Sequence, residues 1–196
     1  MIMYTTRSTL LHKLQNNDSV GYQEFYTVYR NLIYSTALKS GVPAADTDDF
    51  IQAVMLGIFN NGSFLYSKTK HGLFRTYLGG VIHHKICDYF RNCPPATEKA
   101  APEEKARADF EEIFNAEYRS NLLELAIDEL RRKVQPEVFE TFELCFRRNL
   151  SDKEVAMLLN AKPNTVTIRK KRCLETLRTI ITQLKTADPE LDLPIL

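Results

Sequence analysis

Hydrophobic residues return every three or four positions along nearly the whole chain, which is the spacing of one face of an α-helix. The alternation that is typical of strands does not recur, so the pattern predicts an all-α protein. The first long helix is expected to begin near Asp18 or Ser19, which can cap it, and to end at Gly41. A second helix is expected to begin near Asp46, and a third to cover about residues 73–91.

The segment CPPATEKAAP interrupts this pattern. Two adjacent prolines followed by small and charged residues are typical of a boundary between domains. We therefore expect two helical domains, over residues 1–93 and 118–186, with a flexible acidic linker over 94–117 and a tail over 187–196. Four hydrophobic residues at helical spacing also allow a helix in the second half of the linker: Phe110, Ile113, Phe114 and Tyr118.

The segment LSDKEVAMLLNAKPNTVTIRKKRCLETL, residues 150–177, predicts two helices joined by a tight turn. An N-cap, a residue that tolerates a left-handed turn and a second helix start follow in that order: Ser151 or Asp152, then Asn160, then Pro163 or Asn164. This order is typical of a helix-turn-helix, whose second helix lies in the major groove of DNA.

Charge is unevenly distributed in this part of the chain. The formal net charge of the protein is +1 at pH 7, yet residues 162–178 contain six Lys or Arg side chains and one acid. A local basic patch on a nearly neutral chain predicts a local polyanionic partner. Eight residues are expected to contact base edges or phosphates of duplex DNA: Lys162, Asn164, Thr165, Thr167, Ile168, Arg169, Lys170 and Arg172. Taken alone, the segment also fits a solvated basic face on an ordinary helical hairpin.

Four segments occur in the order found in bacterial RNA polymerase sigma factors of the extracytoplasmic-function (ECF) type, and the chain resembles that family. FYTVYRNLIYSTAL (25–38) resembles the first helix of the family's second region, and DTDDFIQAVMLGIF (46–59) resembles its polymerase-binding helix. LFRTYLGGVIHHKICDYFRN (73–92) resembles its promoter-melting helix, and residues 121–181 resemble its fourth region. The resemblance implies a transcription initiation factor, not an enzyme, that recognises the promoter −35 element as duplex and melts the −10 element.

The resemblance also implies a polymerase-binding surface. Asp48, Asp49 and Gln52 would lie on the face presented to core RNA polymerase. Acidic residues in the first turn of a helix also stabilise that helix by themselves, so capping is the simpler explanation of the two acids. The sequence leaves open which hydrophobic side chains of this helix belong to the core and which to the interface: Phe50, Ile51, Val54 and Leu56.

Promoter melting requires a surface that holds unstacked bases, and aromatic and cationic side chains supply one. By resemblance, seven residues would form it: Phe74, Arg75, Tyr77, His83, His84, Lys85 and Arg91. Tyr77 stands where the family usually has tryptophan, and His84 stands where asparagine is common. The alternative is that the aromatic side chains belong to the core together with Leu78, Val81 and Ile82.

Two pairs of side chains could each bridge a metal ion. His83 with Cys87, and His84 with Asp88, are each four residues apart on one predicted helix. The two pairs point in different directions and no recognisable ligand motif accompanies them, so no metal, cofactor or catalytic site is expected.

The cysteines and the N-terminal sequence indicate the cellular compartment in which the protein is expected. Cys87, Cys93, Cys145 and Cys173 lack paired spacing, which predicts free thiols in a cytoplasmic protein. No signal peptide or membrane span is evident, so membrane insertion is not expected. The expected partners are core RNA polymerase and promoter DNA, and the resemblance adds an anti-sigma factor that the sequence does not identify. The alternative function is a helix-turn-helix transcriptional regulator that does not recruit polymerase.

Overall fold

A computed structural model describes residues 7–15, 19–60, 63–92 and 103–187. These residues are almost entirely helical, as predicted, with one pair of two-residue antiparallel strands. The chain divides into two compact units, Met1–Asn121 and Leu122–Leu196, which are described separately below. Within the described residues, every helix is too short or too polar to span a lipid bilayer.

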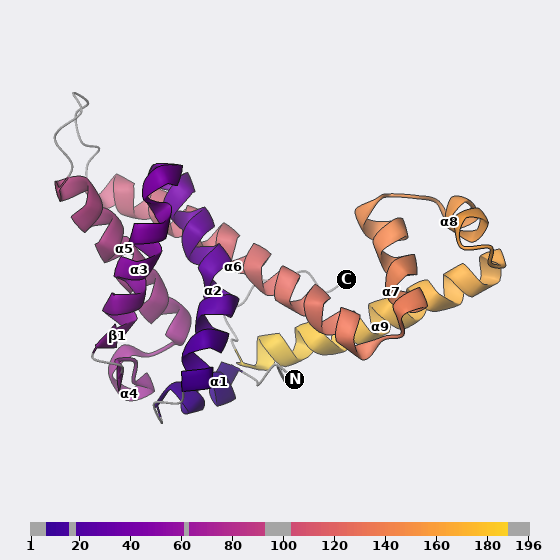
Figure 1. The fold of residues 1–196 in the computed structure, drawn as a ribbon, viewed down its shortest axis with the longest axis horizontal. Coiled ribbons are helices and arrows are strands. Elements are labelled where there is room, and N and C mark those ends of the chain that lie inside the picture. Colours follow the sequence, from indigo (N-terminus) through magenta and orange to yellow (C-terminus); the bar gives the residue numbers. More distant parts are fainter. Residues whose placement is uncertain (1–6, 16–18, 61–62, 93–102, 188–196) are drawn as a thin grey trace. The chain divides into compact units, whose positions relative to one another are not determined.

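Figure 1 shows α2, α3 and α5 as the main body of unit 1. The elements are α1 (Arg7–Gln15), α2 (Ser19–Lys39), the 3₁₀ turn η1 (Ala44–Asp46), α3 (Thr47–Ile58), β1 (Phe59–Asn60), β2 (Ser63–Phe64), α4 (Lys68–His71) and α5 (Phe74–Asn92). The starts and ends predicted for α2, α3 and α5 agree with these bounds to within about two residues. Helix α1 and the strand pair had no counterpart among the sequence predictions.

The end of α2 follows from local chemistry. Gly41 has a φ of 95°, a left-handed conformation that costs glycine little, and its N–H donates to the carbonyl of Leu38. Pro43 lies two residues further on and cannot continue the helix. The chain therefore turns sharply between α2 and α3.

Aromatic rings form a large part of the core of unit 1. Phe25 of α2 is fully buried and packs edge-on against Phe59 and Phe74, with ring centroids 5.5 and 5.9 Å away. Tyr29 lies one turn later on α2 and contacts Phe74 as well. Such edge-to-face pairs add to the stabilisation from burial alone, so the start of α5 is held firmly against α2.

Helix α6 (Glu103–Lys133) begins in unit 1 and ends in unit 2. Residues 103–117, which the sequence placed in a flexible linker with a possible helix in its second half, lie in α6, while residues 94–102 lie outside the described residues. The physical reason is a hydrophobic stripe at four-residue spacing, because Phe110, Phe114 and Tyr118 are all buried. The helix that the sequence allowed there is confirmed.

Unit 2 contains the rest of α6, α7 (Pro136–Phe142), a π-helical turn η2 (Glu143–Arg147), α8 (Asp152–Leu158) and α9 (Pro163–Ala187). Both α7 and α8 contact α9, and Figure 1 shows α7 crossing α9 and α8 near the N-terminal end of α9. The face of α9 toward α7 is apolar, with Cys173 and Leu177 buried, and the Cys173 thiol donates to the carbonyl of Val138 at 3.3 Å. Arg147 of η2 pairs with Glu124 of α6 at 2.7 Å, which links the turn to the first helix of the unit.

Candidate nucleic-acid interface

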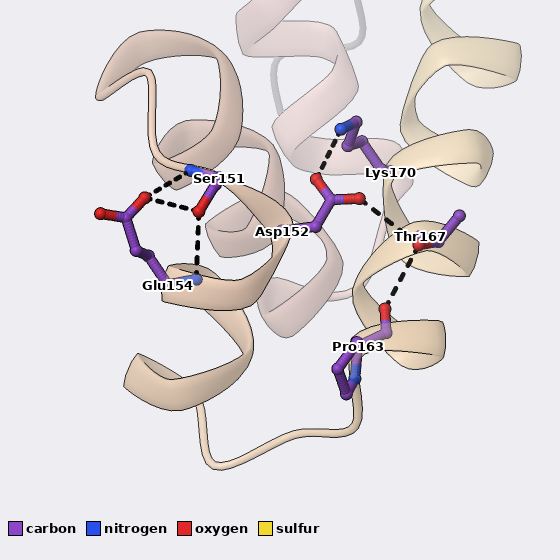
Figure 2. A network of polar contacts seen from close by, with 6 residues as sticks. All are labelled: Ser151, Asp152, Glu154, Pro163, Thr167 and Lys170. Carbon is purple, nitrogen blue, oxygen red and sulfur yellow. Dashed lines mark hydrogen bonds and ion pairs between the residues drawn. The ribbon is translucent and has the colours of Figure 1, made fainter.

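Helix α8 begins with a complete capping box (Figure 2). The backbone N–H of Glu154 donates to Ser151 Oγ at 3.4 Å, and the backbone N–H of Ser151 donates to Glu154 Oε2 at 2.8 Å. The Ser151 hydroxyl donates to the same carboxylate at 2.6 Å, and these bonds lower the pKa of Glu154. Of the two caps considered from the sequence, Ser151 is the one that the structure confirms.

The turn between α8 and α9 has the predicted left-handed residue. Asn160 has a φ of 45°, a conformation that asparagine tolerates better than most residues. The N–H of Ala161 donates to the carbonyl of Ala156 at 2.9 Å and closes the turn. Pro163 is the first residue of α9, where its missing N–H costs nothing.

A small hydrophobic core joins the two helices. Val155 and Val166 are fully buried and Ala156 is 5% exposed, with Leu159 packed against them. The small side chain of Ala156 lets the two helices approach closely. The angle between α8 and α9 is thus set by a packed interface.

Asp152 adds a polar brace across the same interface (Figure 2). Its Oδ1 accepts from Lys170 Nζ at 2.6 Å, and its Oδ2 accepts from Thr167 Oγ1 at 3.4 Å. The hydrogen bond to Asp152 raises the pKa of Lys170. Lys170 Nζ also lies 5.8 Å from the centroid of the Phe146 ring. Thr167 and Lys170, both predicted DNA contacts, are therefore engaged with α8 and η2.

The outward face of α9 carries most of the other predicted DNA contacts. Asn164, Ile168 and Arg172 are exposed, as is Lys162 in the turn, while Thr165 and Arg169 are half-buried. Among the described residues, neither Arg169 nor Arg172 has an ion-pair partner. Both guanidinium groups are available for an external anion.

Lys171 also belongs to this face and was absent from the predicted set. It is exposed, and its ammonium lies 3.9 Å from Glu175, at the limit of an ion pair. Its position seven residues after Asn164 and three after Ile168 places it on the same helical face. Helical spacing, applied to the four consecutive cations, was the signal that separates outward Lys171 from inward Lys170.

Three residues predicted to bind unstacked bases lie against other parts of unit 1. Phe74 is 4% exposed in the aromatic core, so its ring is covered. Arg75 of α5 donates to Asn115 Oδ1 of α6 at 2.5 Å and lies 5.3 Å from the centroid of the Tyr118 ring. The His83 ring packs against Phe110, with centroids 4.8 Å apart. The core alternative weighed from the sequence holds for Phe74.

The other four predicted residues of α5 are at least partly accessible. His84 and Arg91 are exposed, and Tyr77 and Lys85 are half-buried. The Tyr77 ring lies 4.8 Å from His71, and partial burial raises the pKa of the Tyr77 hydroxyl. Arg91 pairs with Asp88 of the same helix at 3.2 Å, a surface pair of little strength.

Helix α3 presents the acidic surface expected from the sequence. Asp48, Asp49 and Gln52 are exposed, and Asp48 pairs with Arg30 of α2 at 3.0 Å. Leu56, one turn beyond Gln52, is 74% exposed. The other three hydrophobic residues that the sequence left open belong to the core: Phe50, Ile51 and Val54.

Capping does not account for every acid around this helix. Asp46, at the N-cap of α3, makes no capping bond with its side chain. Its Oδ2 accepts from the Tyr89 hydroxyl of α5 at 2.5 Å. Asp46 thus links the start of α3 to the end of α5.

His83 and Cys87, two of the side chains considered for a metal site, are in weak contact. Cys87 Sγ lies 3.8 Å from His83 Nε2. Within the ranges that the structure describes, no group of three or more His, Cys, Asp or Glu side chains is arranged to hold a metal ion. Cys87, Cys145 and Cys173 are free thiols, and Cys93 lies outside the described residues.

Residues 25–92 match the family model of Sigma-70 region 2. The matched segment begins within α2, includes α3 and ends with α5. This segment of the chain is therefore similar to region 2 of sigma-70 factors. A comparison with curated proteins found no match to the chain.

Proposed function

We propose that the protein is a transcription initiation factor of the ECF sigma type that makes core RNA polymerase specific for certain promoters. Unit 1 binds the polymerase and captures the melted −10 element, and unit 2 holds the −35 element as duplex. The observation that carries this proposal is the match of residues 25–92 to Sigma-70 region 2. The protein acts where the polymerase and the promoter are, in the cytoplasm, and it needs no cofactor of its own.

The polymerase-binding surface is the outward side of α3. An exposed leucine with acids on the same helix fits an interface in which the apolar group is buried and the charges fix register. Leu56 supplies the apolar group, and Asp48, Asp49 and Gln52 supply the polar rim. Arg30 neutralises part of the charge of Asp48, which leaves Asp49 as the stronger attractor for a basic partner surface.

The duplex-binding surface is the outward side of α9. Asn164, Ile168 and Arg172 present an amide, an apolar group and a guanidinium toward solvent from successive turns. Amides and guanidinium groups bind purine edges, and cations bind phosphates. Arg169 and Lys171 flank these residues and supply phosphate contacts, whereas Lys170 serves the brace with Asp152.

The single-strand surface is the accessible part of α5. His84 and Arg91 are exposed and Tyr77 shows part of its ring, so these residues with Lys85 offer stacking faces and cations. Arg75 and His83 contact α6 and so help to hold α5, which carries this surface, in place. An anti-sigma partner remains a prediction from the resemblance alone.

Titration of fluorescently labelled protein with purified bacterial core RNA polymerase tests the central part of the proposal. Wild-type protein is expected to bind, and Leu56→Arg is expected to weaken binding about tenfold or more, because a buried charge replaces an interface anchor. Met157→Arg is the matched control, since Met157 is 76% exposed on α8 of unit 2. Absence of binding by the wild type contradicts the proposal, and binding of duplex DNA alone favours the regulator without polymerase.

Salt dependence tests the duplex-binding surface. Arg169→Ala and Arg172→Ala are each expected to weaken duplex binding, and Arg169→Ala, which removes a phosphate contact, is also expected to reduce the slope of log affinity against log salt by about 1. Affinity that is unchanged in both variants contradicts the assignment of α9.

A further inference from the structure

Ile168 lies at the centre of the outward face of α9 and is 60% exposed. Asn164 lies four residues before it, and Lys171 and Arg172 lie three and four residues after it, so all four share one helical face. The opposite face is the packed one, where Val166 and Cys173 are fully buried. An apolar, β-branched side chain thus occupies the middle of a polar and cationic surface.

Exposure of a single apolar side chain is common on protein surfaces and by itself indicates nothing. The position of Ile168 is what distinguishes it. Isoleucine is a poorer helix former than alanine or lysine, so an exposed isoleucine costs helix stability without gaining packing. A partner that covers the side chain would offset this cost.

The support behind Ile168 is rigid. Thr167 and Lys170, on either side of it in sequence, are bonded to Asp152 of α8 (Figure 2). Isoleucine has one strongly preferred χ1 rotamer in a helix, so its methyl groups project in one direction. The apolar group is therefore presented in a defined position relative to Asn164 and Arg172.

We propose that Ile168 contacts the 5-methyl group of a thymine in the major groove, and so makes a thymine at one position part of the duplex sequence that unit 2 prefers. This inference rests on the proposed function of α9 as the duplex-binding helix. The thymine methyl is the apolar group on the major-groove edges of the four base pairs, whereas the other groups there are hydrogen-bond donors and acceptors. An exposed isoleucine between an amide and cations matches that edge chemically.

The test begins with selection of duplexes from a random pool by the full-length chain at one fixed salt concentration. In the selected duplex, each thymine is then replaced in turn by uracil, which has the same hydrogen-bonding groups and lacks the methyl. Wild-type affinity is expected to fall about three- to tenfold at one position, the effect of losing one buried methyl contact. Ile168→Ala is expected to bind the thymine duplex more weakly by a similar factor and to bind the two duplexes equally.

Two controls separate a direct contact from general effects of the methyl on DNA. Met157→Ala removes another exposed apolar side chain of unit 2 and is expected to keep the wild-type preference for thymine. Ile168→Val keeps a branched apolar side chain and is expected to keep part of the preference for thymine. Circular dichroism of each variant checks that it is folded. Because Ile168 is exposed, its replacement is not expected to disturb the fold.

The outcomes distinguish this inference from the proposed function. A wild-type protein that selects a duplex but is indifferent to uracil at every position overturns the methyl contact and leaves duplex binding intact. If Ile168→Ala keeps the preference for thymine, another residue contacts the thymine methyl group, and this result also overturns the inference. Failure to select any duplex overturns both the inference and the duplex-binding role of unit 2.

Discussion

Asp152 and Lys170 join α8 to α9 through an ion pair of 2.6 Å. The two side chains are 34% and 33% exposed, so water screens the pair only in part. A cation that the sequence assigned to DNA is thereby used inside the protein, where it fixes the helix that carries the outward residues.

A double-mutant cycle over Asp152→Ala and Lys170→Ala measures this brace. Each single variant is expected to lower the free energy of unfolding by about 0.5–1 kcal/mol, with a coupling of similar size, because the pair is short but half-exposed. Urea unfolding followed by circular dichroism gives these values. The same cycle over Lys171 and Glu175, which lie 3.9 Å apart and are largely exposed, is expected to give a coupling near zero. Additive effects of the Asp152 and Lys170 variants would mean that the brace contributes nothing.

Adjacent glycines in α5 should respond in opposite ways to alanine. A methyl group at Gly79 would stand 2.9 Å from the Phe114 ring of α6, whereas Gly80 faces open space. Gly79→Ala is expected to lower the free energy of unfolding by about 1–3 kcal/mol through this clash. Gly80→Ala is expected to raise it by about 0.5–1 kcal/mol, because alanine loses less entropy in a helix.

Thermal or urea unfolding of the two variants checks this contrast. Replacing Phe114 by leucine in the Gly79→Ala background is expected to recover part of the loss. Equal effects of the two alanines would refute the close packing of α6 on α5.

The sequence predicted helix ends and turns, but not the packing of α6 against α5. Helix ends and the left-handed turn at Asn160 depend on a few neighbouring residues, and local chemistry predicted them. The contact of Arg75 with Asn115 spans 40 residues, and nothing local signals it. The spacing of hydrophobic residues from Phe110 to Tyr118 allowed a helix in this segment, but it did not indicate that the helix packs against α5.

The candidate surfaces were predictable to different degrees. Phe74 lies on the same stripe as Leu78 and Ile82, which favoured the core alternative, although the resemblance placed Phe74 on the base-binding surface. The sequence did not predict the exposure of Leu56, because the apolar residues of α3 are too closely spaced for periodicity to separate core positions from surface positions. Helical spacing indicates the side of α9 on which Lys170 lies, but its pairing with Asp152 depends on where α8 lies, which requires the tertiary structure.

The buried thiol of Cys173 should make stability depend on alkaline pH. Burial raises the pKa of Cys173 from 9.0 to about 11, so the folded protein keeps a proton that the unfolded chain releases. The contribution of this neutral thiol is complete below about pH 9 and is lost as the pH rises toward about 11, by roughly 1–2 kcal/mol. Urea unfolding at a series of pH values is expected to give a steeper alkaline decline for the wild type than for Cys173→Ala. Parallel declines would contradict a protonated thiol in this position.

His84 is expected to act in promoter opening. It is exposed on α5, and loss of one stacking face costs about 1–3 kcal/mol per base. His84→Ala is therefore expected to slow strand opening roughly five- to a hundredfold, while formation of the closed complex changes little. Fluorescence of 2-aminopurine in the promoter follows opening, and filter binding follows the closed complex. An equal loss at both steps would remove this role.

Transcription from a genomic DNA library by core RNA polymerase, with and without the purified protein, tests the central claim most directly. Mapping the transcript ends identifies where the polymerase starts. New start sites are expected that share one upstream and one downstream sequence element and that disappear with Leu56→Arg. An unchanged set of start sites, with a polymerase preparation that accepts a known initiation factor, would contradict the central claim.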